Sequence, residues 1–186
     1  DKTPTLSGSL YSFGMKANNF SLDGIFNGKL DASISNVKFS GGGGTKEVLT
    51  NTLSVTAAAL YMQNTISVGT YFSGDLNFTR TNSSFSISTQ TLGNTYVYGL
   101  YAGKSLSIAN GHGLIDANIT VKTTNSDDWT RVIGVYAPTI NAESFGANIT
   151  VTSDRSDLVV GIQADKFVNG TDSVFNTITS TFDIIG

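Results

Sequence analysis

Apolar and polar residues alternate along short stretches of this chain, and turns rich in Gly, Asn and Ser separate the stretches. The segments 105–108 and 117–121 show the pattern clearly. Strict alternation is typical of β-strands that bury one face and expose the other to water. No stretch of about ten residues has the period of an amphipathic helix. The pattern therefore predicts an all-β chain of short strands.

A four-residue motif returns five times: a small residue, an apolar residue, any residue, then Ala or Met. Two clear copies are Gly99-Leu100-Tyr101-Ala102 and Gly134-Val135-Tyr136-Ala137. The copies begin at residues 14, 59, 99, 134 and 161, so the interval between them falls from 45 residues to 27. A constant motif at a shrinking interval indicates that the strands persist while the loops change length.

Two further strands are predicted after the strand that holds each motif. Residues 65–68 are an example of the second strand of a repeat, and residues 117–121 and 147–151 are examples of the third. Three short strands per repeat predict a right-handed parallel β-helix of about five coils, in which neighbouring coils share their buried surface. An antiparallel β-sandwich or barrel is the alternative fold, but it does not predict the return of one tetrapeptide.

Stacked coils place corresponding residues in columns. We expect one inward column from the apolar residue of each motif copy, namely Met15, Leu60, Leu100, Val135 and Ile162. We expect a second from the last residue of each copy, namely Ala17, Met62, Ala102, Ala137 and Ala164. We interpret residues 1–186 as a single β-helix domain.

Composition narrows the function classes. Charged residues make up 13% of the chain, against roughly 25% in an ordinary globular domain. The net charge is −3 and the Lys and Arg residues are scattered, which argues against nucleic-acid binding. The absence of cysteine excludes disulfides and Cys-based zinc sites. We predict no cofactor.

The repeated Gly-aliphatic-Tyr-Ala and Ala-Asn-Ile-Thr-Val segments resemble the passenger regions of bacterial autotransporters and adhesin-like surface proteins, over roughly residues 11–186. The resemblance implies a β-helix that is secreted or held at the cell surface, in association with the outer membrane. It also implies that the chain is a fragment of a longer repeat protein, attached to a membrane only through a region absent from this sequence.

The third residue of each motif copy supplies a candidate ligand-binding site. If Leu100 and Ala102 point inward, Tyr101 points outward. The same alternation places five residues on one outer face: Lys16, Tyr61, Tyr101, Tyr136 and Gln163. The three tyrosines would form an aromatic ladder that offers platforms to sugar rings. The alternative interpretation is that they only stabilise the stack through contacts between coils.

Acidic residues and the single histidine supply the remaining candidates. Asp31, Asp75 and Asp116 begin predicted third strands and would form a carboxylate column, as in a carbohydrate-active β-helix enzyme. Like charges about 5 Å apart repel, however, which disfavours this arrangement. Oxygen-rich loops can bind Ca²⁺, but we interpret the loop carboxylates as solvated and predict no metal site; they are Asp127, Asp128, Asp154 and Asp157. His112 lies between two glycines and is interpreted as a turn residue.

These observations favour a non-enzymatic, cell-surface or secreted β-helical segment that acts as an adhesin-like or structural spacer module. Its expected partners are glycans or proteins of a host or cell surface. The alternatives are a carbohydrate-active β-helix enzyme, either a polysaccharide lyase or a hydrolase, and a segment of a phage tail or spike.

Overall fold

The computed structural model describes residues 7–35, 38–41, 52–81, 84–87, 95–108, 114–124, 130–142, 144–153, 158–168, 177–178 and 181–185. Within these ranges the chain forms β-strands joined by turns and no helix, which confirms the all-β prediction. The described part of the chain accordingly contains no helix that is apolar and long enough to span a membrane.

The first sheet is built from the five motif copies and the strands that follow them. Each copy lies in a strand that pairs in parallel with the next copy; these strands are β1 (Ser7–Leu22), β4 (Thr52–Val68), β7 (Thr95–Ala102), β10 (Thr130–Tyr136) and β14 (Leu158–Gln163). The second half of β4 pairs with β8 (Ser105–Ile108), followed by β11 (Thr139–Asn141) and β15 (Lys166–Val168). The first and second predicted strands of the first two repeats therefore run as one long strand.

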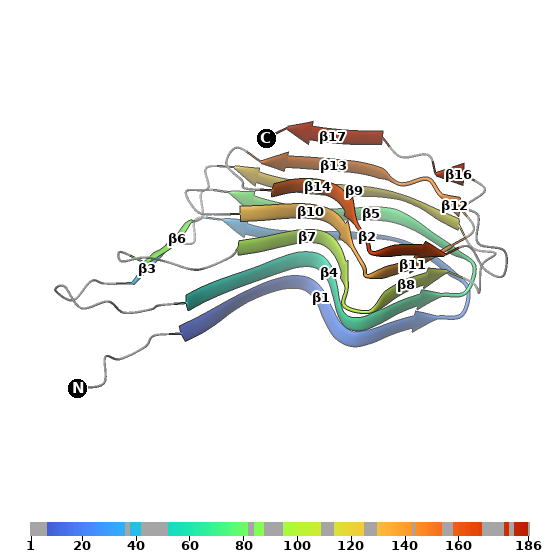
Figure 1. Cartoon of the computed structure of the whole chain (residues 1–186), viewed down its shortest axis with the longest axis horizontal. Helices are drawn as coiled ribbons and strands as arrows, with labels where there is room; N and C mark the ends of the chain where they lie inside the picture. Colours follow the sequence, from blue (N-terminus) through green and yellow to red (C-terminus); the bar gives the residue numbers. More distant parts are fainter. Residues whose placement is uncertain are drawn as a thin grey trace.

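The second sheet contains the predicted third strands. It pairs β2 (Ile25–Ser35) with β5 (Tyr71–Thr81) and β5 with β9 (Leu114–Thr124). Beyond β9 lie β12 (Ser144–Phe145), β13 (Asn148–Ser153), β16 (Thr177–Ile178) and β17 (Thr181–Ile185), and β3 (Lys38–Gly41) pairs separately with β6 (Ser84–Ile87). All pairs are parallel, and Figure 1 shows the strands of the two sheets running in opposite directions.

The core lies between the two sheets. Leu60, Leu100 and Val135 are each 1% exposed, and the pairing register aligns them with Met15 and Ile162, which confirms the first predicted column. Burial of one such side chain contributes about 1.5–3 kcal/mol relative to leaving it exposed. Met15 is 42% exposed because β1 has a described neighbour on one side only.

From Met62 onward the second predicted column also lies in or against this core, whereas Ala17 on β1 is exposed. The register pairs Ala17 with Met62 and Met62 with Ala102. Ala137 is buried in the same apolar cluster, and Ala164 packs against it at lower burial.

The small residue of the motif marks a bend in the first sheet, where alternation is interrupted. Ala59 and Leu60 both belong to the core, whereas Ala58 and Tyr61 belong to a cluster on the outer face. A Cβ atom on Gly99 would lie against Ile119 Cγ2 of the opposite sheet and 2.7 Å from the backbone oxygen of Gly134. The backbone therefore approaches the second sheet too closely for a larger side chain.

We predict that Gly99→Ala and Gly134→Ala each lower the free energy of unfolding by about 1–3 kcal/mol, because the added methyl overpacks the bend. A Cβ on Gly134 would lie against Ile149 Cγ2 and 2.6 Å from the oxygen of Gly161. Gly28→Ala is the matched control, since its Cβ would meet nothing closer than Phe26 Cζ at 3.8 Å. Urea unfolding followed by circular dichroism measures the three variants. Equal losses in all three would contradict the close approach at the bend.

Candidate functional site: an outer aromatic face

The predicted outer ladder forms in the predicted register. Lys16 pairs with Tyr61, Tyr61 with Tyr101, Tyr101 with Tyr136, and Tyr136 with Gln163. The rings of Tyr61 and Tyr101 lie 4.4 Å apart at 3°, and those of Tyr101 and Tyr136 lie 5.0 Å apart at 10°. These separations follow the spacing of about 4.8 Å between neighbouring strands. The three rings therefore stack as a continuous ladder.

Two more columns lie beside the ladder on the same outer face. One contains Tyr11, Thr56, Tyr96, Arg131 and Leu158. The other contains Phe13, Ala58, Tyr98, Ile133 and Val160. We call these two columns together with the ladder the aromatic face. The motif predicts the ladder but not the other two columns. The alternating run Tyr96-Val97-Tyr98, which places two tyrosines on one face of a strand, indicates them.

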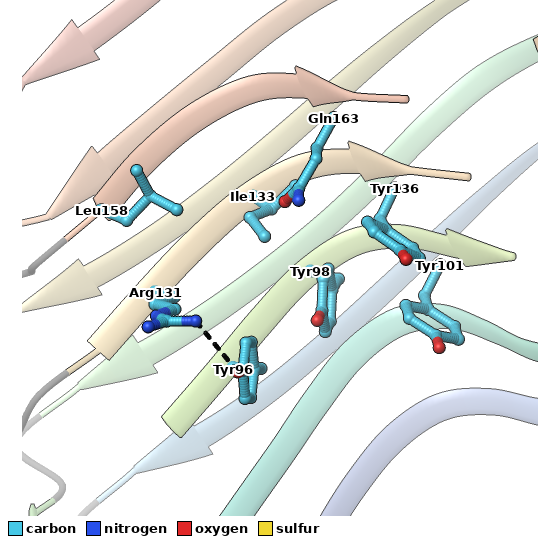
Figure 2. A pocket seen from close by; sticks show the side chains of 8 residues that line it. All are labelled: Tyr96, Tyr98, Tyr101, Arg131, Ile133, Tyr136, Leu158 and Gln163. Carbon is cyan, nitrogen blue, oxygen red and sulfur yellow. Dashed lines mark hydrogen bonds between the residues drawn. The ribbon is translucent and has the colours of Figure 1, made fainter. Parts of the chain in front are cut away.

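An open depression of about 290 Å³ lies on this face, over β7, β10 and β14 (Figure 2). Its lining residues are Tyr96, Tyr98, Tyr101, Arg131, Ile133, Tyr136, Leu158 and Gln163. Tyr98 is only 6% exposed. Its ring lies 5.0 Å from that of Tyr101 at 61° and 6.0 Å from that of Tyr136 at 57°. Tyr98 thus presents its edge to the ladder, an arrangement that the aromatic quadrupole favours.

The aromatic face carries two cations. Arg131 donates a hydrogen bond from Nη1 to the Tyr96 hydroxyl at 3.1 Å, and its Cζ lies 5.5 Å from the centre of the Tyr96 ring. Lys16 Nζ lies 4.9 Å from the ring centre of Tyr11 and 5.0 Å from that of Phe13. None of the three columns contains a carboxylate among the paired residues that form them. The paired residues of the three columns therefore carry two positive charges, on a chain whose net charge is −3.

The buried hydroxyls of this face resist ionisation. Burial first, and then the neighbouring Tyr61 and Tyr136, which disfavour a second negative charge, together raise the pKa of Tyr101 to about 12. Burial likewise raises the pKa of Tyr98 far above its ordinary value. Both hydroxyls are neutral at physiological pH, and that of Tyr101 is hydrogen-bonded to Tyr61.

The carboxylate column of Asp31, Asp75 and Asp116, which charge repulsion disfavours, does not form. The register places Asp31 opposite Asn77, Asp75 opposite Asn118, and Asp116 opposite Ser73. Each aspartate is displaced by two residues from the next, so no two of them are directly opposite. This displacement avoids the repulsion between like charges that face each other on neighbouring strands.

Amide groups take the places next to the aspartates. Asn77 Nδ2 donates to Asp31 Oδ1 at 2.7 Å, and Asn118 Nδ2 donates to Asp75 Oδ1 at 3.0 Å. The hydrogen bond from Asn77, followed by the Lys29 ammonium 3.2 Å away, holds the pKa of Asp31 below its ordinary value. These residues form an exposed polar ladder rather than a catalytic carboxylate pair.

The remaining candidates from the sequence are one histidine and four loop aspartates. His112 and the loop residues Asp127, Asp128, Asp154 and Asp157 lie outside the described residues. The residues that are described contain no group of three or more His, Cys, Asp or Glu side chains arranged to hold a metal ion. Comparison of the chain with family models, curated proteins and solved structures finds no match.

We predict that the protein loses stability as the pH rises from 10 to about 12, because folding favours the neutral form of Tyr101. The contribution of the neutral Tyr101 hydroxyl to stability is fully present below the ordinary tyrosine pKa of 10.0. It is lost as the pH rises through the raised pKa of the folded state. Tyrosinate absorbance should show late titration in the folded protein, and Tyr101→Phe should remove one late-titrating group. The urea-unfolded chain, in which tyrosines titrate near their ordinary value, is the control. Identical titration curves for folded and unfolded chains would contradict the burial of these hydroxyls.

Proposed function

We propose that the chain is a right-handed parallel β-helix of about five coils that acts outside the cell as an adhesin-like module and binds carbohydrate on its aromatic face. Five motif copies that pair in parallel and share one core support the helical arrangement. The low charge, the absence of cysteine and the resemblance to autotransporter passenger regions support an extracellular or cell-surface location.

The depression beside Tyr136 is the observation that carries the binding proposal. Tyr61 and Tyr136 cover the two faces of Tyr101, so the Tyr101 ring cannot stack on a sugar. Phe13, whose ring centre is 4.5 Å from that of Tyr61, lies at the other end of the ladder. Tyr136 differs, because the next residue of its column is Gln163, which has no ring. One sugar ring would therefore stack on the face of Tyr136 directed toward Gln163.

Polar groups around Tyr136 can fix the orientation of such a sugar. The Tyr101 hydroxyl and the exposed Gln163 amide line the same depression. Half-open pockets with an apolar wall and a few convergent polar groups are the usual form of small-ligand sites. Tyr61, by contrast, lies outside the lining of the depression and contributes to the site by supporting Tyr101.

An enzymatic function is the weaker proposal. A carbohydrate-active β-helix would need two or more carboxylates near one scissile bond. The sequence offers one such group on its strands, the column of Asp31, Asp75 and Asp116. The pairing register displaces each of these residues by two positions from the next. We therefore propose binding without catalysis.

We predict that Tyr136→Ser weakens glycan binding by about tenfold or more, because it removes the free stacking surface. Tyr136→Phe should retain most of the affinity, since the ring remains. A glycan array first identifies a neutral oligosaccharide that binds, and calorimetry then measures the variants. Tyr71→Ser, a tyrosine of β5 on the other sheet, is the control and should bind as the parent does.

Two outcomes would contradict this prediction. If the parent binds no glycan on the array, the carbohydrate-binding proposal is wrong. If Tyr136→Ser binds as tightly as the parent, the ladder stabilises the stack and does not bind sugar. Thermal unfolding of each variant separates a loss of binding from a loss of folded protein.

A further inference from the structure

The depression has an aromatic end and a cationic end on one strand. Arg131 and Tyr136 both lie on β10 and both line the depression, with Ile133 between them (Figure 2). Five residues of extended strand span roughly 16 Å, and the bend of the sheet shortens this somewhat. That length exceeds one sugar ring. A ligand that reaches both ends is therefore an oligosaccharide, with one ring on Tyr136 and another beside Arg131.

The guanidinium of Arg131 is held in place before any ligand arrives. It is half-buried, and Tyr96 fixes it through the hydrogen bond to its hydroxyl and through the ring at 5.5 Å. A guanidinium has five N–H donors, and the bond to Tyr96 uses one of them. Within the described part of the chain Arg131 has no carboxylate opposite it, since its partners in the register are Tyr96 and Leu158. A preorganised cation loses little conformational entropy when it binds an anion.

Arg131 is the one charged side chain among the described residues that line the depression. The apolar side chains of Ile133 and Leu158 line the depression beside Arg131, and charge-assisted hydrogen bonds are roughly twice as strong as neutral ones. A neutral sugar would use none of this charge.

We propose that the depression selects acidic oligosaccharides, with a sugar carboxylate or sulfate bound by Arg131 and a neighbouring sugar ring stacked on Tyr136. This inference rests on the proposed carbohydrate-binding function and adds the chemical class of the ligand. Arginine suits the role because its planar fork matches the two oxygens of a carboxylate or sulfate group.

The experiment compares acidic sugars with neutral sugars of the same linkage. The first pair is an oligogalacturonate and its carboxyl-reduced form; the second is a dextran sulfate oligosaccharide and the corresponding dextran. Calorimetry of the parent should show at least one acidic member binding about tenfold tighter than its neutral partner. A preference in the first pair identifies uronic acids as the ligand class, and one in the second identifies sulfated sugars. Added salt should reduce the preference.

Three variants test whether Arg131 is responsible for the preference for acidic sugars. Arg131→Gln should abolish the difference between acidic and neutral members, while Arg131→Lys should retain part of it because the charge remains without the fork. Lys122→Gln removes one positive charge from β9 on the other sheet, at an exposed position, and should keep the full preference. Circular dichroism confirms that each variant is folded.

The outcomes separate the two proposals. Equal binding of acidic and neutral sugars, or an acidic preference that survives in Arg131→Gln, overturns the inference about charge and leaves the stacking site on Tyr136 standing. Failure of the parent to bind any oligosaccharide of either pair or of the glycan array overturns the proposed function itself.

Discussion

The structure depends on one constraint: each strand pairs in parallel with the corresponding strand of the next repeat, residue against equivalent residue. Parallel pairing at about 4.8 Å converts a sequence repeat into a set of columns. A column of aliphatic residues becomes the core, because its members contact one another and the opposite sheet. A column of tyrosines becomes a ladder, since the strand spacing is close to the preferred distance for stacked rings.

The same constraint limits which polar residues can recur. A column of identical charges would place them about 5 Å apart, where they repel. The second sheet avoids this by placing amides next to Asp31 and Asp75: Asn77 donates to Asp31, and Asn118 donates to Asp75 and in turn accepts a hydrogen bond at 3.0 Å from Asn148 Nδ2. Asparagine suits such a ladder because its amide both donates and accepts. The exposed polar ladder of the second sheet and the tyrosine ladder of the first thus both follow from parallel pairing in register.

Alternation and repetition predicted the columns but not the bend. The inward column of Leu60, Leu100 and Val135 follows from the motif alone. Simple alternation back from Tyr101, however, places Tyr98 inward, whereas it faces outward beside Tyr101 because two consecutive motif residues face the core. Alternation therefore predicts Tyr101 and Tyr136 on the outer face but does not predict Tyr98 or Arg131 there. A bend of this kind comes from close approach of the opposite sheet, which is a tertiary contact that local periodicity does not encode.

Two further features lay beyond sequence reasoning for similar reasons. The two-residue displacement of Asp31 from Asp75 depends on the pairing of β2 with β5, which the motif spacing does not give: the offset is 45 residues between Met15 and Leu60 but 46 between Ile25 and Tyr71, because the register shifts between Ala17 and Asn19. Arg80 is fully buried at a position that pairs with Ile34 and Thr123, although arginine is rarely buried in full. Its place follows from its strand, in which Leu76 and Phe78 also face the core.

The pairing register can be measured directly, because the chain has no cysteine of its own. Ser67 and Ser107 lie opposite each other on neighbouring parallel strands, at a Cα separation of about 4.8 Å that a disulfide can bridge. The variant carrying Ser67→Cys and Ser107→Cys should form an intramolecular disulfide rapidly under mild oxidation. The variant carrying Ser67→Cys and Ser105→Cys, two residues out of register, should not, because that separation exceeds the limit of about 7 Å. Equal rates in the two variants, or no disulfide in the first, would contradict the in-register parallel stack on which the aromatic face depends.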